Sequence, residues 1–300
     1  MDSFELHITV DETTTLIPFL KAQCEIAGND LSISQLKNAI SKGALWIGRG
    51  KQVQRLRRFK KPLKPGEELH FYFNEKVLDE AVPVAKLIAD LSSYSVWYKP
   101  YGMLSQGSKW SDHTTISRWA QTHLTPERPV FIVHRLDRAA TGLILVAHSK
   151  AAARGLSAMF EQHELEKHYQ IIVHGNHAKR AQPDVITQDI DGKSAKSTFN
   201  CLEYDAKADI SLVDVKIDSG RKHQIRLHAA GIGLPVVADR LHGDKEHEYP
   251  DTLNLQLCAV SLDFTCPMSG EERSFKLDES LLPNLDMVRS KLLPSFSSNR

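Results

Sequence analysis

The chain is organised around residues 131–147, which read Phe131-Ile132-Val133-His134-Arg135-Leu136-Asp137-Arg138-Ala139-Ala140-Thr141-Gly142-Leu143-Ile144-Leu145-Val146-Ala147. Apolar runs over 130–133 and 143–147 are typical of buried strands. They predict a charged turn between two strands, with Thr141-Gly142 marking its end. The turn carries one carboxylate, Asp137, between two arginines. Because buried strands hold a side chain more rigidly than a free loop does, we expect the chemistry of the protein here.

On spacing alone, this turn also fits an ordinary solvated connection between two strands. A motif resemblance favours the catalytic interpretation. His134-Arg135-Leu136-Asp137, followed by Thr141-Gly142-Leu143, resembles the signature H-R-L-D-x-x-T-S-G-L of the RluA-type pseudouridine synthases. Ala140-Thr141-Gly142 stands where Thr-Ser-Gly is common, a difference that leaves the aspartate in place.

The composition describes a globular protein with one basic segment. The 300 residues allow one large domain or two unequal ones, with enough chain for a substantial core. The net charge is only +1, yet residues 31–66 contain ten Lys and Arg and no acidic residue. This asymmetry predicts one basic surface on an otherwise balanced protein.

Four cysteines without C-x-x-C spacing indicate reduced, mostly buried thiols, and hence a cytoplasmic location. The first residues lack the apolar region of a signal peptide. No apolar run approaches the ~20 residues that span a bilayer, so no membrane association is expected.

Residues 1–75 predict a small α/β domain. Hydrophobic patterning predicts the order strand 4–10, helix 11–23, helix 33–40, strand 44–47 and strand 69–73. Pro18 is compatible with the first of these helices only near its first turn.

This order of elements resembles the S4-like RNA-binding module, in which a K-P-G-[DE] turn precedes the last strand. Here the turn is Lys64-Pro65-Gly66-Glu67. A run of positive charge is often only a solvated face. The absence of acids, with Trp46 and Phe59 interleaved, favours a surface that follows RNA phosphates. The candidate RNA contacts are Arg55, Arg57, Arg58, Lys60 and Lys61.

A second domain is expected over 85–290, after a linker over 76–84 and before a tail over 291–300, and about the last 20 residues are expected to fray. Its predicted elements are a strand or helical turn over 85–91, strand 94–99, irregular chain over 105–128, a helix over 150–163 capped by Ser149, strand 169–174, loops and a hairpin over 176–197, strand 213–217, a short helix ending at Gly231 and strand 255–264.

Further motifs of the same synthase family occur in order along this domain. Lys99-Pro100-Tyr101-Gly102 resembles the turn N-K-P-x-G, with Tyr98 in place of Asn. Residues 166–169 resemble K-x-Y, and residues 219–228 resemble T-G-R-x-H-Q-[IL]-R-x-H with Ser219 in place of Thr. Residues 233–243 resemble G-x-P-[IL]-x-G-D-x-x-Y-G, with Ala238 and His242 in place of Gly and Tyr. The resemblance therefore covers nearly the whole chain.

The resemblance implies an α+β protein: the catalytic fold of a pseudouridine synthase, with a central mixed, largely antiparallel sheet, plus the S4-like module. It implies an enzyme that isomerises specific uridines in structured RNA to pseudouridine. The N1–C1′ bond breaks, the base turns and C5 joins C1′ without a redox change, so no cofactor and no metal is expected. The implied partner is structured RNA, with ribosomal RNA favoured over transfer RNA, and no obligatory protein partner.

The resemblance also implies roles for individual residues. Asp137 is the catalytic carboxylate, either attacking the sugar or base or taking a proton during glycal formation, and Arg226 pairs with it. Tyr169 stacks on the extruded base and assists removal of the C5 proton. Arg135 holds the flipped nucleotide or fills the gap it leaves. The remaining substrate-binding candidates are His134 and Arg221.

Three other classes of protein compete with this interpretation. A metal hydrolase is disfavoured, because the histidine pairs 223/228 and 242/247 are each five residues apart, which is not one helical face. A glycosidase or nucleosidase needs a second carboxylate, and none stands out in the motifs. The main alternative is an RNA-binding or RNA-chaperone protein with a degenerate synthase domain. Asp137, Tyr169 and Arg226 at their motif positions argue against it.

Overall fold

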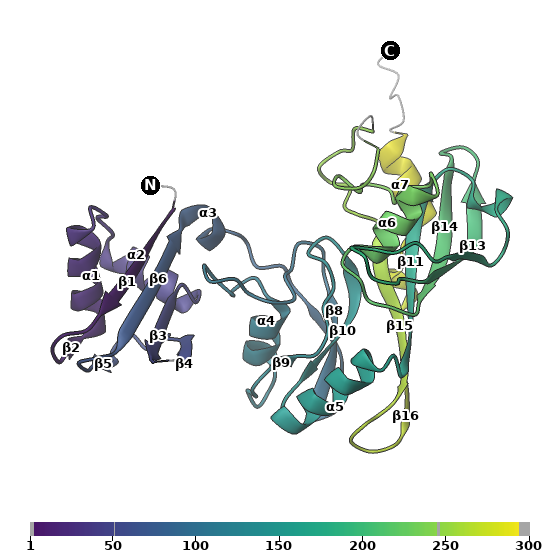
Figure 1. Ribbon diagram of the computed structural model, residues 1–300. Helices are drawn as coiled ribbons and strands as arrows, with labels where there is room; N and C mark the ends of the chain where they lie inside the picture. The colour runs from purple at the N-terminus through teal and green to yellow at the C-terminus, as the bar shows by residue number, and fades with distance from the viewer. Residues whose placement is uncertain (1–2, 51, 245–246, 294–300) are drawn as a thin grey trace, which may run out of the picture. The chain divides into compact units, whose positions relative to one another are not determined.

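The structure is a computed structural model that describes residues 3–50, 52–244 and 247–293. Its helices and strands are labelled in Figure 1. The chain forms two compact units. The small unit comprises Met1–Val82 with Gln106–Trp119, and the large unit comprises Pro83–Ser105 with Ala120–Arg300.

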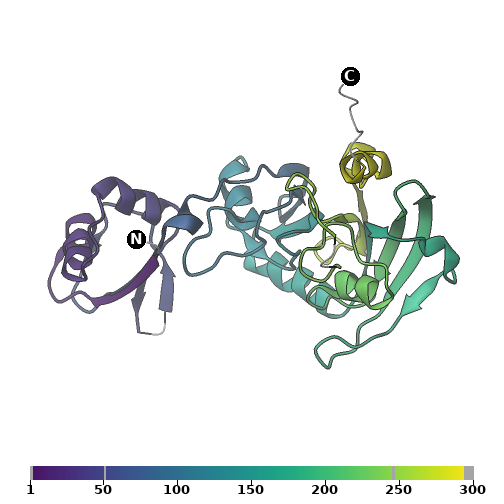
Figure 2. The same cartoon turned by 90° about the horizontal axis from the view of Figure 1, so that it is seen from above.

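A four-stranded antiparallel sheet forms the centre of the small unit. Its strands, in spatial order, are β1 (Ser3–Thr9), β6 (Glu68–Asn74), β3 (Leu45–Arg49) and β4 (Gln52–Arg55). Two helices lie on the same side of this sheet, as Figures 1 and 2 show: α1 (Leu16–Ile26) and α2 (Ile33–Ser41). The unit is completed by the short pair β2 (Thr14–Thr15) and β5 (Pro62–Leu63) and by helix α3 (Glu75–Leu78).

Buried and more exposed residues alternate along the strands, and the buried ones form the core of the small unit. Leu69, Phe71 and Phe73 are buried on one face of β6 and pack in the same cluster as Leu16 and Leu20 of α1. Each such buried side chain contributes about 1.5–3 kcal/mol to folding. The expected order of strands and helices in this unit is therefore found, with differences at its edges.

Three of these differences have local causes. The first helix begins at Leu16 and not at residue 11, because Thr14 and Thr15 pair with β5 as a strand. Pro18 is its third residue, where a helix leaves the N–H unbonded, as expected. Strand β4, which the sequence did not predict, follows a turn at Gly50 with φ of +64°. The chain expected to begin a linker at residue 76 is still helical, because α3 buries Leu78 in the core.

Residues 106–119 belong to the small unit, although the sequence placed them in the second domain. The amide of Asp112 donates to the carbonyl of Lys42 (3.1 Å), and His113 Nε2 lies 3.1 Å from the carbonyl oxygen of Glu80. The region expected to be irregular also contains helix α4 (Ile116–His123). Its polar residues obscured the helical pattern in the sequence.

One ten-stranded sheet carries the large unit. Its main strand order is β12-β13-β14-β11-β15-β10-β8-β7, with β16 paired to β15 and β9 to β10. Every pairing is antiparallel except that of β10 with β15. The α+β fold with a mixed, largely antiparallel sheet is thus confirmed. The strands are β7 (Lys86–Asp90), β8 (Tyr94–Lys99), β9 (Phe131–Ile132), β10 (Thr141–Ala147), β11 (Leu165–His174), β12 (Asp184–Ile186), β13 (Ser197–Asp205), β14 (Ile210–Ile217), β15 (Leu257–Thr265) and β16 (Glu272–Lys276).

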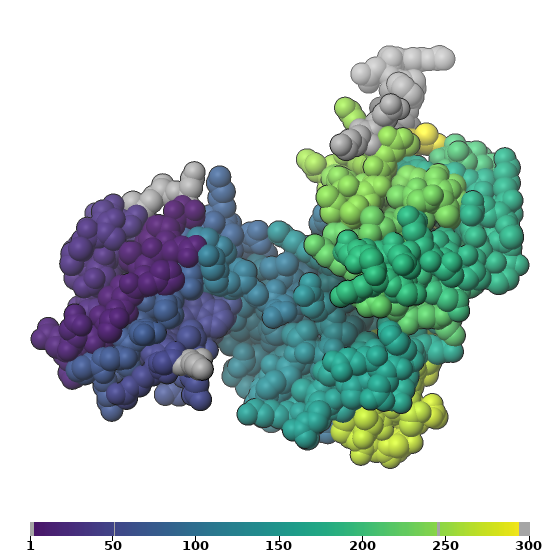
Figure 3. Space-filling view, viewed as in Figure 1, coloured from purple at the N-terminus to yellow at the C-terminus, as the bar shows by residue number. Residues whose placement is uncertain are grey.

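The helices of the large unit are α5 (Lys150–Glu161), η1 (His177–Lys179), α6 (Gln224–Gly231), η2 (Glu279–Leu281) and α7 (Leu285–Leu292). Helix α5 is capped by Ser149, as predicted, and packs Leu156 and Met159 into one cluster with β10. Figure 3 shows the turn of the β15–β16 hairpin, in yellow, at one end of this unit. The predicted fraying is wrong for α7, which buries Leu285 and Val288. Residues 294–300 of the predicted tail lie outside the described residues.

The turn before β10 differs from the prediction in its boundaries. The expected buried strand over 130–133 is only the two-residue, half-buried β9. Thr141 and Gly142 begin β10 and do not end the turn, because they pair with Cys258 and Ala259 of the parallel neighbour β15.

No helix in the described ranges is long and apolar enough to cross a bilayer. Cys24, Cys201, Cys258 and Cys266 are free thiols, and all but Cys201 are buried.

Candidate active site

The turn that carries Asp137 is fixed on both sides of the aspartate. The hydroxyl of Ser105 donates to the carbonyl of Leu136 (2.8 Å) and accepts from its amide (3.1 Å). On the other side, the amide of Gly102 donates to the carbonyl of Arg138 (2.9 Å). Hydrogen bonds therefore fix the backbone on both sides of Asp137. Its carboxylate is held as rigidly as a side chain on a strand or helix would be.

Lys99 adds a buried ammonium group to this anchor. It is fully buried, and its Nζ donates to the carbonyls of Met103 (2.9 Å), Pro100 (3.2 Å) and Arg138 (3.4 Å). Burial lowers the pKa of Lys99 to about 7, and the negative charge of Asp137 opposes this shift. The sequence marked Lys99 only as part of a turn motif, and its position beside Asp137 was missed.

Arg226 links Asp137 to a second carboxylate. Its Nη1 lies 3.4 Å from Oδ2 of Asp137, the pair that the resemblance implied. Its closest contacts, however, go to Asp239: Nε to Oδ2 at 2.7 Å and Nη2 to Oδ1 at 2.6 Å. Asp239 is 2% exposed and Arg226 is 6% exposed. Burial alone would raise the pKa of Asp239, but the hydrogen bonds and charge of Arg226 outweigh it and lower that pKa.

Asp239 was missed as a site residue, although it stands in the quoted motif over 233–243. The signal was present, because a buried arginine needs a compensating charge. The preceding Ala238 has a φ of +60°, which explains why glycine is usual there in the family.

Other residues of the motif over 219–228 hold helix α6 in place. The side-chain amide of Gln224 accepts from the hydroxyl of Ser219 through Oε1 (2.7 Å) and donates to Ser197 Oγ through Nε2 (2.9 Å). His228 lies 2.9 Å from the same Ser197 hydroxyl. These buried polar groups are satisfied within the protein, so they fix the direction of α6 and thereby that of Arg226.

Tyr169 reaches the same place from β11. Ala259 of β15 pairs with Gly142 on one side and with Tyr169 on the other. The register of β11 with β15 shifts between His168 and Tyr169, an irregularity of the kind that redirects side chains near active sites. Burial raises the pKa of Tyr169, and the charge of Asp137 adds to this, so the phenol stays protonated.

A small cavity of about 80 Å³ lies at this junction. Its lining includes Asp137, Tyr169, Arg135, Arg221 and His223. The sequence therefore named four of these five, and missed His223. The cavity is smaller than the roughly 300 Å³ of ordinary ligand pockets. A nucleobase would thus have to displace side chains at its edge, where Arg135 is exposed.

His134 is not among the residues that line the cavity. Its Nε2 accepts from the amide of Leu145 (2.9 Å), and its ring stacks on Phe160 at 4.2 Å. Burial lowers the pKa of His134 to about 3, with the Lys167 charge adding to the effect. A neutral ring held between β10 and α5 supports the fold, and the substrate-binding role of His134 stays a prediction.

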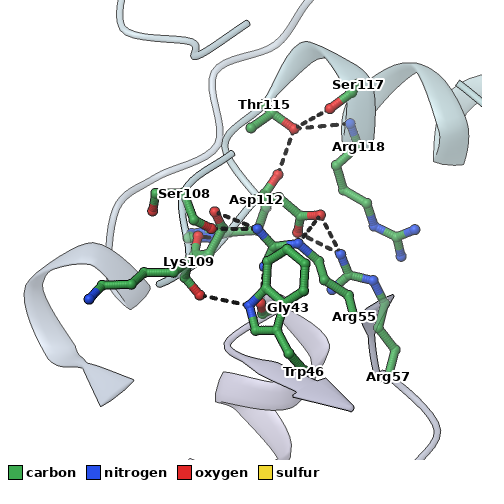
Figure 4. Close-up of polar contacts among 12 residues, drawn as sticks. Gly43, Trp46, Arg55, Arg57, Ser108, Lys109, Asp112, Thr115, Ser117 and Arg118 are labelled. Carbon is green, nitrogen blue, oxygen red and sulfur yellow. Dashed lines mark hydrogen bonds and ion pairs between the residues drawn. The ribbon is translucent and has the colours of Figure 1, made fainter. Parts of the chain in front are cut away.

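Two of the basic residues predicted to contact RNA are held by partners inside the small unit. Figure 4 shows Arg55 and Arg57 converging on Asp112. Arg57 Nη2 lies 2.6 and 2.5 Å from the two carboxylate oxygens, and Arg55 Nε lies 3.2 Å from Oδ2. Arg55 also donates to the carbonyls of Gly43 and Ser108. We call this arrangement of Arg55, Arg57 and Asp112 the Asp112 clamp.

The rest of the basic segment is divided. Lys61 pairs with Glu67 (2.8 Å), whereas Arg58 and Lys60 are exposed, with no ion pair to either in the described part of the chain. Trp46 was expected to lie among the basic residues of an RNA-binding surface. Its ring instead packs on Arg55 at 4.2 Å, and its Nε1 donates to the carbonyl of Lys109 (3.0 Å).

Comparisons with known proteins agree with this fold. Residues 93–231 match the family described as RNA pseudouridylate synthase. An uncharacterized RNA pseudouridine synthase of Aquifex aeolicus is 30% identical over 279 residues, covering 83% of this chain and 86% of that protein. The dual-specificity RNA pseudouridine synthase RluA of Salmonella typhimurium is 32% identical over 199 residues, covering 60% of this chain and 86% of that protein.

Among solved structures, human RNA pseudouridylate synthase domain containing 1 superposes with a TM-score of 0.55 at 20% identity, covering 72% of this chain and 97% of that one. Human RNA pseudouridylate synthase domain containing 4 gives a TM-score of 0.54 at 20% identity, covering 69% and 92%. These likenesses establish the fold. The relatives and the family match establish more: the chain belongs to the RluA-type RNA pseudouridine synthases. It is therefore an RNA-modifying isomerase.

Proposed function

We propose that this protein converts specific uridines of structured RNA to pseudouridine with Asp137 as its catalytic carboxylate. The observation that carries the proposal is the meeting of three elements at one cavity. Asp137 of the turn before β10 and Tyr169 of β11 line this cavity together with the start of α6. Arg226 of α6 does not line the cavity but lies 3.4 Å from the aspartate. These are the three residues that the motifs singled out.

The arrangement suits the chemistry of the reaction. Breaking the N1–C1′ bond requires a carboxylate that is ionised and precisely held. The guanidinium of Arg226 stabilises the negative charge of Asp137, while its own bidentate pair with Asp239 keeps it from moving. Tyr169 places a protonated phenol and an aromatic face at the cavity, where a uracil ring would stack.

The small cavity also supports base flipping. A uridine within a helix cannot bring its C1′ to a carboxylate inside a cavity, so the nucleotide must leave the stack, at a cost of a few kcal/mol. Arg135 is exposed at the cavity edge, and we assign it to the phosphate or to the gap that the base leaves. Arg221 lines the cavity and donates from Nε to the carbonyl of Ser194 (3.0 Å), which leaves its terminal nitrogens for the RNA.

A glycosidase would use a second carboxylic acid as a proton donor, with a raised pKa. Asp239 is the acid that contacts Arg226, yet its pKa is lowered and it accepts from Arg226 and from the amides of Leu241 and His242. A carboxylate in that state does not donate a proton. The site therefore favours isomerisation over hydrolysis.

The RNA class follows from relatives and from the small unit. One relative, 34% identical over 169 residues, is tRNA pseudouridine synthase C of Yersinia pestis. Another, 31% identical over 191 residues, is ribosomal large subunit pseudouridine synthase C of Salmonella typhi. We assign an S4-like RNA-binding role to residues 1–75, in which Arg58 and Lys60 are exposed RNA contacts, and ribosomal RNA as the favoured substrate. The four free thiols support a protein that acts in the reducing cytoplasm.

The test is incubation of the purified protein with unmodified ribosomal RNA and, separately, unmodified transfer RNA, followed by mapping of pseudouridine. Pseudouridine at discrete positions in the ribosomal pool is expected. Modification of transfer RNA alone would revise the substrate class. Tight RNA binding without any product in either pool would support the RNA-binding alternative with a degenerate synthase domain.

A further inference from the structure

Two histidines in contact with one another, His223 and His242, lie beside Asp137. His223 precedes α6, and its backbone has a φ of +56°, a left-handed conformation that is uncommon for histidine. Its Nε2 lies 3.7 Å from Oδ2 of Asp137, and its side chain is 17% exposed. The other ring nitrogen, Nδ1, lies 2.8 Å from Nε2 of His242.

This geometry determines where the ring protons lie. Burial lowers the pKa of His223; the charge of Asp137 opposes the shift, and Arg226, His242 and Lys222 add to it. A neutral imidazole has one donor and one acceptor nitrogen. The carboxylate favours the form in which Nε2–H of His223 faces it, because a bare lone pair there would be repelled. His223 Nδ1 is then the acceptor, so Nε2–H of His242 must be the donor.

Arg226 and His223, the two side chains beside Asp137 that carry N–H groups, face the same carboxylate oxygen. Arg226 Nη1 is 3.4 Å and His223 Nε2 is 3.7 Å from Oδ2. No hydrogen bond or ion pair within the described residues reaches Oδ1. One oxygen is therefore held by the protein, which leaves the other to face the substrate.

We propose that His242 is a positioning residue for the isomerisation: its Nε2–H holds His223 in the tautomer whose Nε2–H points toward Oδ2 of Asp137, so that Oδ1 is presented to the uridine. The inference rests on the proposed function and deepens it. His242 stands where tyrosine is usual in the family, and a phenol at this place can donate to Nδ1 of His223 in the same way. The role thus belongs to a donor and does not require a second imidazole.

The decisive comparison is His242→Tyr with His242→Phe, which differ by one hydroxyl group. We expect His242→Phe to lower kcat about tenfold with KM unchanged, since a misplaced catalytic group slows the chemical step and not binding. We expect His242→Tyr to restore kcat to within about threefold of the wild type. A matched control is His174→Phe, which breaks the hydrogen-bonded pair of His174 Nε2 with the Tyr249 hydroxyl (2.7 Å), away from the cavity, and should leave kcat unchanged.

A second readout does not depend on activity. Nitrogen NMR of the histidine rings should show His223 as the Nε2–H tautomer in the wild type and in His242→Tyr, and as a mixture in His242→Phe. Equal kcat values for the tyrosine and phenylalanine variants, both folded by thermal melting, would overturn the proposal. An Nδ1–H tautomer of His223 in the wild type would overturn it as well. A wild type that forms no pseudouridine would instead overturn the proposed function, and the NMR result would still decide the tautomer.

Discussion

Arg226 is buried with one close carboxylate and one more distant one, and this asymmetry separates its two tasks. The pair with Asp239 compensates the buried charge, with contacts of 2.7 and 2.6 Å. The contact with Asp137, at 3.4 Å, is looser and leaves that carboxylate available for chemistry. A single arginine thus connects the stability of the large unit to the geometry of the site.

We predict that Arg226→Met lowers the free energy of unfolding by about 3–5 kcal/mol, because it leaves Asp239 buried and uncompensated. The matched control is Arg289→Met, which removes a half-exposed arginine paired with Asp205 and Asp286 and should cost much less. Chemical denaturation measures both. Equal losses would contradict the compensating role of Arg226.

Lys99 gives the protein a specific pH dependence. Its pKa falls from 10.5 to about 7 on folding, because it is buried. Between these pH values the unfolded chain binds a proton that the folded chain has released, so the free energy of unfolding rises with pH in this window. We predict that Lys99→Met removes this rise. Urea unfolding of both proteins between about pH 7 and 10 measures it, and an identical slope in the variant would refute the prediction.

At the scale of elements, the site depends on the single parallel pairing of the large sheet. Gly142 has a φ of +110° and lies against Ala259, and a Cβ at this position would come within 2.3 Å of the Ala259 carbonyl oxygen. Only glycine lets β10 approach β15 so closely. This close approach brings the turn that carries Asp137 next to β15, the strand that pairs with Tyr169 of β11.

We therefore predict that Gly142→Ala destabilises the protein by about 3 kcal/mol, from combined backbone strain and overlap. Gly192→Ala is the control, since Gly192 also has a positive φ, of +69°, but has open space around it. It should cost about 1 kcal/mol. Thermal melting compares the two, and similar values would mean that the β10–β15 contact relaxes without loss.

Sequence patterns predicted those elements whose apolar residues repeat regularly, such as β6, β8 and α5. They failed where contacts between distant segments determine the local structure. Strand β9 is short because the chain turns toward Asp137. Helix α4 is short and mostly polar, so its apolar face, with Ile116 and Ala120, is brief. In the site, motif positions identified Asp137, Tyr169 and Arg226. They did not identify Lys99, His223 or Asp239, because only the fold shows which buried charges meet.

At the scale of the whole molecule, the Asp112 clamp changes the expected RNA-binding surface. Arg55 and Arg57 are occupied by Asp112, and a Cβ at Gly43 would lie 2.5 Å from the same carboxylate, so the contact is closely packed. A patch of charge in the sequence cannot show which cations are already paired. Residues 106–119 also pack in the small unit, so deleting residues 1–75 would remove partners of Asp112. Point substitutions are the cleaner test.

We predict that replacing Arg58 and Lys60 together by alanine weakens RNA binding and lowers the salt dependence of the affinity by a slope of about 2, close to one phosphate contact each. The control is Lys207→Ala, an exposed lysine between Asp205 and Asp209. Filter binding at several salt concentrations provides the slopes. An unchanged slope in the double variant would remove these two residues from the RNA-binding surface.

The central claim is that Asp137 performs the chemistry. Its most direct test is single-turnover release of tritium from RNA labelled at C5 of uridine, comparing the wild type, Asp137→Asn and the control Asp189→Asn, whose aspartate is exposed before β13. We predict that Asp137→Asn binds RNA within about twofold of the wild type yet releases no tritium, while Asp189→Asn behaves as the wild type. Tritium release by Asp137→Asn within about tenfold of the wild-type rate would contradict the account.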